Sequence, residues 1–151
     1  MANVKTPQNP SKKATARVKN PLPAPTSCRF CKSNVRIATH LEVYGRDYSD
    51  WPYMYLCDDC GAYVGMHPFT NIPLGTLADR QTRLARKMCK MPLENIWKSE
   101  AMTRSEAYTW LAGELNISVS ECHFGWFDVS LCEKAKDICL NKMSEAVTNN
   151  G

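Results

Sequence analysis

Eight cysteines are the residues whose type and spacing point most directly to chemistry in this chain of 151 residues. Four of them form two Cys-x-x-Cys pairs, Cys28 with Cys31 and Cys57 with Cys60. A gap of two residues lets both thiolates of a pair bind one tetrahedral ion, and four thiolates arranged in this way are typical of a structural zinc site. The sequence therefore predicts one structural Zn²⁺, bound by Cys28, Cys31, Cys57 and Cys60.

Other chemistry of the same thiols fits the pattern less well. A thioredoxin-like redox site uses a single Cys-x-x-Cys pair at the start of a helix within a βαβ unit, which this sequence lacks. The sequence shows no signal peptide and no run of about 18 apolar residues, so we expect a cytoplasmic protein without a membrane segment. Because thiols stay reduced in that compartment, zinc is favoured over disulfides, and iron–sulfur binding is a minor alternative.

A second metal site is a further hypothesis. Cys122, His123 and Cys132 offer suitable ligand types, but their spacing contains no Cys-x-x-Cys pair. Free cysteine is among the most buried residue types, which favours core thiols at the four remaining positions, Cys89, Cys122, Cys132 and Cys139. The sequence leaves the choice between metal ligand and core residue open.

His67 raises the question of an enzyme. It follows the second cysteine pair, as in nucleases built on zinc-stabilised ββα folds, which need a His base and a further ligand such as Asn71. Residues 66–69 lead into a turn that contains proline, so we expect His67 to support the fold and keep a nuclease as a remote alternative. No Ser–His–Asp order, phosphate loop or pair of catalytic carboxylates is recognisable, which favours a non-enzymatic protein without a small-molecule substrate.

The positive charge of the chain is concentrated at its start. The formal net charge is +4, and residues 1–27 carry five cations and no acid, which leaves residues 28–151 at −1. The same segment holds five of the nine prolines and few apolar residues, so we expect a disordered basic tail over residues 1–27. The tail is either a solubilising leader or an arm that contacts nucleic acid through Lys12, Lys13, Arg17 and Lys19.

Residues 28–72 carry the pattern of a small zinc ribbon. Apolar and aromatic residues recur there with a period of two, at Val35, Ile37, Leu41, Val43, Tyr53 and Tyr55. Gly61 directly follows the second cysteine pair, at a position where a turn often requires positive φ. We therefore expect three short strands whose small core is supplemented by metal binding.

Residues 73–143 have the pattern of a helical domain. A first helix is expected to begin near Thr76, with an apolar seam made by Leu77, Leu84, Met88 and Met91. Pro92 should end or kink that helix. Five cations on the same helix suit either a phosphate backbone or an acidic protein surface: Arg80, Arg83, Arg86, Lys87 and Lys90.

Three capping boxes, which begin at Thr103, Ser118 and Ser130, predict three compact helices after the first one. A DNA-reading helix-turn-helix is disfavoured, because the helix after Ser118 is short and carries Glu121. The predicted fold class is therefore α+β, with a disordered basic tail (1–27), a three-stranded zinc ribbon (28–72), a compact helical domain (73–143) and a disordered C-terminus (144–151).

Several motifs in one order resemble a known family. After the first cysteine pair come CDDCGAYVGMH at 57–67, PLGTLAD at 73–79, RSEAYTWLA at 104–112 and ECHFGWFD at 121–128. This string is similar to the zinc-finger-containing domain family found in bacteriophages and prophages, over about residues 28–140. Lys32 stands where we expect Gly, and residues 88–90 read Met-Cys-Lys where relatives tend to carry a His. The resemblance implies a phage-encoded protein with a four-cysteine zinc site, and it assigns no established reaction.

Two functional hypotheses follow for a non-enzymatic protein of the host cytoplasm. The first is a nucleic-acid or nucleoprotein binding module, which contacts DNA or RNA through the basic tail and the cations of residues 80–90. The second is a protein-interaction module that binds and modifies a host complex, such as the transcription machinery or a defence system. Binding through phosphate contacts weakens steeply with salt, which separates the first hypothesis from the second.

Overall fold

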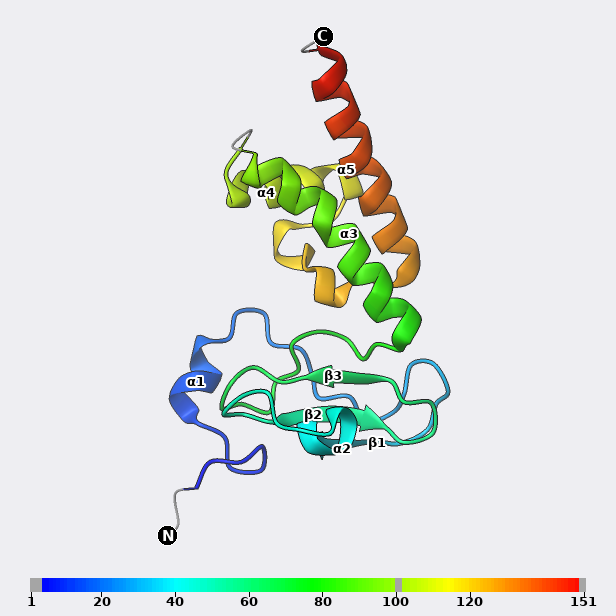
Figure 1. Cartoon of the computed structure of the whole chain (residues 1–151). Coiled ribbons are helices and arrows are strands. Elements are labelled where there is room, and N and C mark those ends of the chain that lie inside the picture. Colours follow the sequence, from blue (N-terminus) through cyan, green and yellow to red (C-terminus); the bar gives the residue numbers. More distant parts are fainter. Residues whose placement is uncertain (1–3, 100–101, 150–151) are drawn as a thin grey trace. The chain divides into compact units, whose positions relative to one another are not determined.

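The computed structural model describes residues 4–99 and 102–149 and has the predicted α+β composition (Figure 1). The chain forms two compact units, which meet in sequence between Asp79 and Arg80. We call them the ribbon unit and the helical unit, and each is considered by itself. No helix among the described residues combines the length and apolar character needed to cross a membrane.

The ribbon unit contains the predicted three-stranded sheet, and its strands are antiparallel. Its three strands are β1 (Val35–Thr39), β2 (Tyr53–Cys57) and β3 (Tyr63–Gly65), in the order β1-β2-β3. Ile37 pairs with Tyr55, and Tyr55 pairs with Val64 on the other side. One small buried cluster consists of Cys28, Trp51, Tyr55, Cys57, Ala62, Val64, Met66 and Leu77, and Ala38, Met54, Ile72 and Ala78 are buried outside it. A core of this size is consistent with the need for metal binding to stabilise the unit.

A short helix, α2 (His40–Tyr44), replaces the strand that the two-residue period of Leu41 and Val43 indicated. The Thr39 side chain accepts a hydrogen bond from the Glu42 N–H, and the Glu42 side chain accepts one from the Thr39 N–H. This capping box begins the helix, and Gly45 ends it in the left-handed conformation with φ of 85°. Local capping therefore overrides the alternating pattern over these five residues.

The ribbon unit extends beyond residue 72, the boundary expected from the sequence. Isolated bridges pair Met66 with Pro73 and Tyr63 with Ala78. Leu77, expected in the seam of the first helix, is instead buried in the ribbon core. The backbone of residues 73–79 thus satisfies its hydrogen bonds against β3, and the following helix begins only at Arg80.

The N-terminal segment, expected to be disordered, contains a helix, α1 (Lys12–Arg17). Ser11 caps it by accepting a hydrogen bond from the Ala14 N–H at 3.2 Å. The segment is also attached to the rest of the ribbon unit. The Ser11 N–H donates to the Phe69 carbonyl at 2.8 Å, and the Asn71 side chain donates to the Pro7 carbonyl at 3.4 Å. These contacts place α1 beside the loop that follows β3 (Figure 1).

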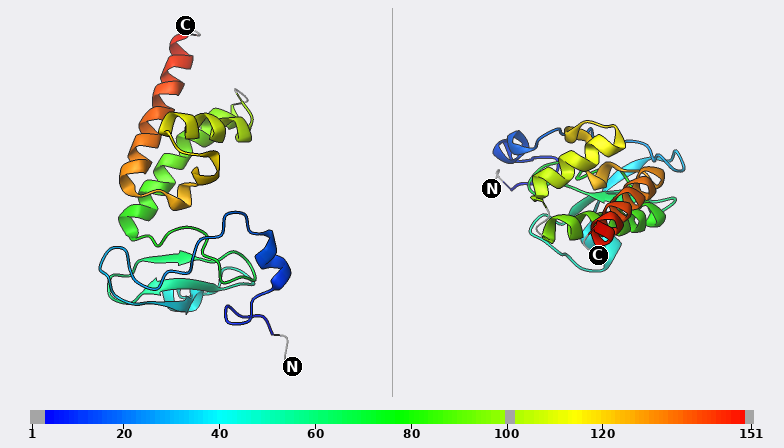
Figure 2. Two further views of the ribbon diagram at one scale, coloured as in Figure 1. Left: turned by 180° about the vertical axis from the view of Figure 1, so that it is seen from behind. Right: turned by 90° about the horizontal axis from the view of Figure 1, so that it is seen from above.

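The helical unit consists of α3 (Arg80–Lys98), α4 (Arg104–Leu115) and α5 (Val129–Asn149), with two short 3₁₀ helices, η1 (Val119–Glu121) and η2 (Phe124–Trp126). The predicted capping box at Thr103 is present, and Asn116 ends α4 with φ of 61°. Ser118 leads only into η1, and Asp128 rather than Ser130 provides the side-chain cap of α5. The helix α5 continues to Asn149, into the segment expected to be disordered. Figure 2 shows α3 and α5 packed along each other.

Pro92 lies inside α3 and is buried, so of the two outcomes expected from the sequence, an end or a kink, the end is wrong. A proline in a helix interior costs about 3 kcal/mol relative to alanine. Here Pro92 and the adjacent Leu93 are both buried, with Leu93 in the core of the helical unit. Burial of apolar surface against the other helices offsets that cost and keeps the helix continuous.

The predicted apolar seam of α3 is also wrong. Leu84, Met88 and Met91 are 58%, 43% and 52% exposed. The buried stripe is instead Cys89, Leu93 and Ile96, which has the same helical spacing on the opposite side. It packs in one cluster with small residues of α5, namely Cys132, Ala135 and Cys139. Small side chains allow a close approach of the two helices, which selects this stripe over the larger exposed one.

Candidate metal centre

The two cysteine pairs lie in turns of the same kind. The Cys28 carbonyl accepts from the Lys32 N–H at 2.9 Å, and the Cys57 carbonyl accepts from the Gly61 N–H, also at 2.9 Å. The donor residue is left-handed in both turns, with φ of 69° at Lys32 and 79° at Gly61. The sequence predicted positive φ at Gly61. Lys32 adopts the same left-handed conformation, which is unfavourable for a residue with a Cβ.

The sheet brings the two turns together. The first turn immediately precedes β1, and the second directly follows β2. Because β1 and β2 are antiparallel and Val35 pairs with Cys57, the start of one strand lies beside the end of the other. The strand register therefore places both cysteine pairs at the same end of the sheet.

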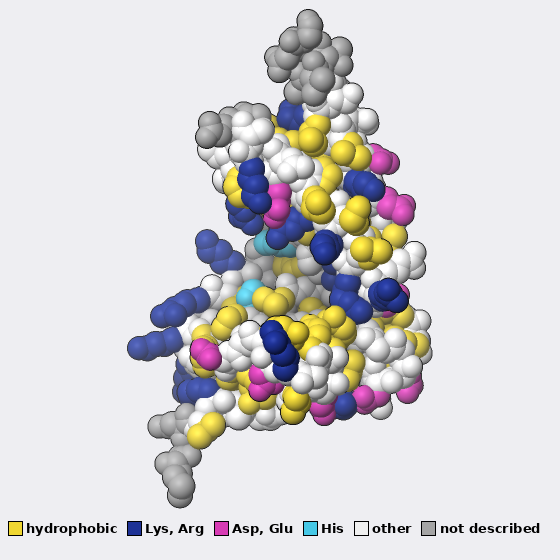
Figure 3. All heavy atoms as spheres, in the orientation of Figure 1, with side chains coloured by type: hydrophobic (Ala, Val, Ile, Leu, Met, Phe, Trp, Pro, Cys, Tyr) yellow, Lys and Arg dark blue, Asp and Glu magenta, His cyan; other side chains and the backbone are white. Residues whose placement is uncertain are grey.

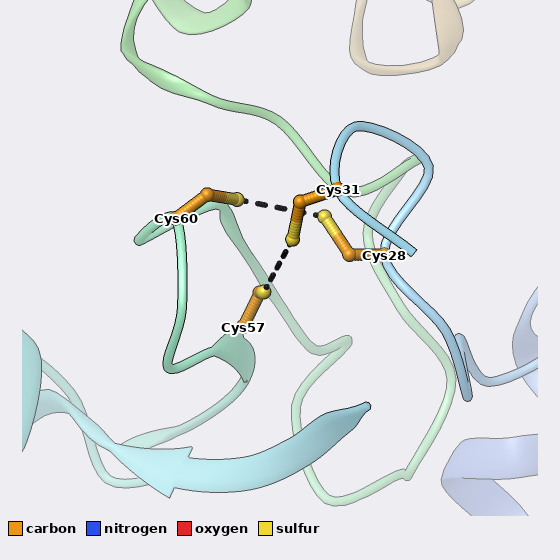
Figure 4. Close-up of side chains that lie close together, drawn as sticks. All are labelled: Cys28, Cys31, Cys57 and Cys60. Carbon is orange, nitrogen blue, oxygen red and sulfur yellow. Dashed lines mark hydrogen bonds between the residues drawn. The ribbon is translucent and has the colours of Figure 1, made fainter. Parts of the chain in front are cut away.

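The four sulfur atoms converge on one point, as Figure 4 shows. All four lie within 4.8 Å of one another, with 3.5 Å between the Cys28 and Cys60 sulfurs and 3.4 Å between those of Cys31 and Cys57. A tetrahedral zinc ion with Zn–S distances of about 2.3 Å separates its ligands by about 3.8 Å. The sulfur distances therefore lie close to those around a zinc ion, and small movements of the sulfurs would let the cluster hold one. No other group of three or more potential ligands occurs among residues 4–99 and 102–149.

The thiols of this cluster differ in acidity. A hydrogen bond from the Ser33 backbone is the main cause that lowers the pKa of Cys31 to about 6. The Ala62 N–H lowers the pKa of Cys60, but burial and the three neighbouring thiols outweigh it and raise that pKa to about 12. Four thiolates repel one another at such short distances. A divalent cation removes this conflict, because it binds all four in the deprotonated form.

Polar contacts around the cluster connect the two turns to the sheet. Ser33 donates its hydroxyl hydrogen bond to Asp59, which links the first turn to the second. Arg36 of β1 forms an ion pair with Asp58 at 2.7 Å, and this contact lowers the pKa of the Asp58 carboxyl. Arg29 donates to the Thr76 hydroxyl at 3.0 Å, which attaches the first turn to the segment after β3. These bonds orient the ligands from outside the metal site.

The other ligand types considered from the sequence do not assemble into a group of three or more metal ligands within the described residues. Cys122 and Cys132 are buried in the core of the helical unit together with Cys89 and Cys139. His123 is exposed and its ring lies 4.5 Å from that of Trp126. Burial raises the pKa of Cys122 to about 11, as expected of a core thiol.

His67 and Asn71 belong to a tight turn of the ribbon unit. The His67 N–H donates to the Ile72 carbonyl at 2.9 Å, and its carbonyl accepts from Thr70. Burial lowers the pKa of the His67 imidazole. Asn71 uses its side-chain amide to hold the N-terminal segment through Pro7. Both residues thus have roles in the fold.

The cations predicted to bind a partner occupy different environments. Lys12, Lys13, Arg17 and Lys19 are exposed on or beside α1. On α3, Arg80, Lys87 and Lys90 are exposed, and Lys90 forms an ion pair with Glu94 at 3.5 Å. Arg83 and Arg86 are half-buried, and Arg86 donates to the Phe127 carbonyl at 2.8 Å, which gives it a role inside the helical unit.

Sequence reasoning missed Phe69, which is 42% exposed and left-handed, with φ of 61°. No sequence pattern predicts its backbone conformation, because left-handed positions are usually occupied by Gly, Asn or Asp.

Comparison with known proteins supports the zinc assignment. Residues 24–142 match the model of a zinc-finger-containing domain. No curated protein and no solved structure matched the chain.

Removing the metal should unfold the ribbon unit and leave the helical unit folded. The ribbon core is small, and structural zinc contributes about 10 kcal/mol or more to comparable zinc-finger peptides, whereas the helical core contains no metal cluster among its described residues. Hydrogen exchange after chelation should show loss of amide protection in β1–β3 and retention in α3 and α5.

Native mass spectrometry should find one zinc ion per chain. The ion should be lost in Cys57→Ser and kept in Cys122→Ala. Two zinc ions, or loss of protection in α3, would contradict this assignment.

The two turns provide a matched test of backbone strain. Lys32→Gly should stabilise the zinc-bound protein by about 0.5–1 kcal/mol, because glycine adopts positive φ without a steric cost. Gly61→Ala should destabilise it by about 1 kcal/mol, because alanine adopts positive φ only at a steric cost. No heavy atom lies within 4 Å of the added Cβ, so neither a clash nor a new contact changes this cost. Thermal unfolding and zinc competition against a chelator measure both effects. Equal signs for the two substitutions would be inconsistent with this account.

Proposed function

Because the chain belongs to the zinc-finger-containing domain family, we propose that its zinc cluster is a scaffold for a non-enzymatic nucleic-acid binding module. The observation that supports this proposal best is the attachment of the basic N-terminal segment to the ribbon unit. A free tail would present its charges diffusely, whereas the helix α1 presents them from a defined surface.

The charge of this surface is of one sign. The first acidic residue of the chain is Glu42, so the whole N-terminal segment is without a carboxylate. Among the described residues, the ion pairs do not involve the cations near α1, which are Lys12, Lys13, Arg17 and Lys19. Lys and Arg side chains project from the part of the ribbon unit that carries α1 (Figure 3). Unpaired cations on one surface attract phosphate groups and release their counterions.

The zinc cluster acts on this surface through the ribbon fold. The metal fixes the two turns, the turns flank β1 and β2, and the sheet positions the loop after β3. That loop in turn holds α1 through Ser11 and Asn71. On this proposal the metal does not contact nucleic acid and has no part in a reaction.

The α3 cations form a second candidate surface, on the helical unit. Arg80 and Lys87 are exposed and lie seven residues apart, which places them on one face of the helix. They support the same proposal, with DNA or RNA as ligand.

Binding to nucleic acid should depend steeply on salt and on the α1 cations. The variant Lys12→Ala/Lys13→Ala/Arg17→Ala should lose about tenfold or more in affinity for a short labelled oligonucleotide at low salt. For a single strand its salt slope should fall by about 2, because each phosphate contact contributes about 0.7. Fluorescence anisotropy at about 50 to 200 mM salt measures both quantities.

A control variant with the same change in net charge is Lys98→Ala/Arg104→Ala/Lys134→Ala, whose side chains are exposed on the helical unit. It should bind almost as well as the natural chain. Equal losses in the two variants would show that net charge alone matters, and affinity that is independent of salt would refute phosphate contact.

A specific observation also favours the second hypothesis, a protein partner. Leu84, Met88 and Met91 are exposed at helical spacing on α3. Leu84 and Met88 line a groove of about 220 Å³ together with Ala85, Val129 and Lys136. Apolar side chains interrupt the charged surface of α3 and α5 (Figure 3). Flexible methionines suit binding of an amphipathic helix, so a host protein complex is the second candidate partner.

The protein hypothesis predicts that Met88→Glu/Met91→Glu abolishes capture of a partner from host lysate, because it places charge on the apolar stripe. The tagged chain should retain that partner after nuclease treatment. Val119→Glu is the control, since Val119 is also 52% exposed but lies on η1. A partner that disappears with nuclease, or that binds both variants equally, would exclude the stripe as its docking surface.

A further inference from the structure

Phe69 has an unusual backbone conformation for an aromatic residue. Its φ is 61°, in the left-handed region that bulky side chains rarely occupy. Neighbouring loop positions include Asn71, a residue type that tolerates this region better. The fold therefore holds an unfavourable conformation at a surface position, a feature that is concentrated at binding sites.

Hydrogen bonds fix the turn of residues 67–72 from several sides. The Thr70 N–H donates to the His67 carbonyl at 3.1 Å, and the Trp51 indole N–H donates to the Thr70 carbonyl at 2.9 Å. The Phe69 carbonyl accepts the bond from Ser11 at 2.8 Å. Thr70 itself is completely buried. These bonds hold the Phe69 backbone in its left-handed conformation.

The Phe69 ring is both supported and accessible. Its centroid lies 5.1 Å from that of Trp51, and Trp51 packs against Tyr53 at 4.9 Å. Trp51 is 5% exposed, whereas Phe69 is 42% exposed. Phe69 is thus the outer end of a row of aromatic rings, and part of its surface is open to solvent. A leucine at position 69 would also cover Trp51, so packing alone does not require an aromatic ring there.

Two cations follow in sequence the residue whose backbone bonds to Phe69. Ser11, which bonds to the Phe69 carbonyl, is followed in the chain by Lys12 and Lys13, and both lysines are exposed. From this juxtaposition we propose that Phe69 and α1 form a binding site for single-stranded nucleic acid. One base stacks on the Phe69 ring, and the adjacent phosphates contact Lys12 and Lys13. The proposal rests on the proposed function and specifies its ligand.

The aromatic ring selects a single strand over a duplex. Bases in a duplex are covered on both faces by their neighbours, so a protein ring can stack only on a base that is unstacked. A positively charged surface alone binds either form, whereas stacking is available to the single strand. The site should therefore prefer single-stranded DNA or RNA, with little dependence on base sequence.

The test compares Phe69→Leu with Phe30→Leu in the full zinc-bound chain. Phe30 is 40% exposed on the first cysteine turn, so the two variants lose the same chemical group at similar exposure. The ligands are labelled oligo-dT and oligo-U of about ten nucleotides and a duplex of equal length. Phe69→Leu should weaken single-strand binding by about tenfold, leave duplex binding unchanged and be rescued by Phe69→Tyr. Phe30→Leu should bind all three ligands as the natural chain does.

The possible outcomes separate this inference from the function on which it rests. If Phe69→Leu binds single strands normally while Lys12→Ala/Lys13→Ala does not, the stacking site is wrong and phosphate binding by α1 is retained. If the natural chain binds neither form at low salt, the proposed function itself fails. Equal affinity losses for single strand and duplex in Phe69→Leu would indicate a structural role and would also overturn the proposal.

Discussion

The ribbon unit depends on the convergence of four thiols at one end of a three-stranded sheet. Sulfur atoms as close as 3.4 Å cannot all be ionised unless a cation lies among them. The same atoms, once bound to zinc, tie residues 28–31 to residues 57–60 and close the sheet. Every feature that we connect with binding in this unit, including the loop after β3 and α1, is built on that closed sheet.

The zinc cluster could be predicted because its signal is local and chemical. Two Cys-x-x-Cys pairs are typical of few sites besides tetrahedral zinc, and the strand pattern at Val35 and Ile37 lies next to the first pair. The turn at Gly61 was also predictable, since glycine marks a position of positive φ. The binding residues are different, because spacing identifies cations but does not identify what they contact.

The features that the sequence did not predict arise from contacts between distant segments. The attachment of α1 to the ribbon unit depends on a backbone bond between Ser11 and Phe69, which no residue type encodes. On α3 two apolar stripes have equal helical spacing, and only the small residues of α5 decide that Cys89 rather than Met88 faces the core. Pro92 obeys the same principle, because burial outweighs its local tendency to end a helix.

Pro92 has a consequence for whatever covers the exposed face of α3. Proline has no N–H, so the carbonyl of Met88, one helical turn earlier, lacks the donor that would normally pair with it. Met88 belongs to the exposed apolar stripe. A partner that buries the Met88 backbone would have to supply a donor for this carbonyl. The apolar surface would then contain one polar requirement, which distinguishes a matching partner from one that is merely apolar.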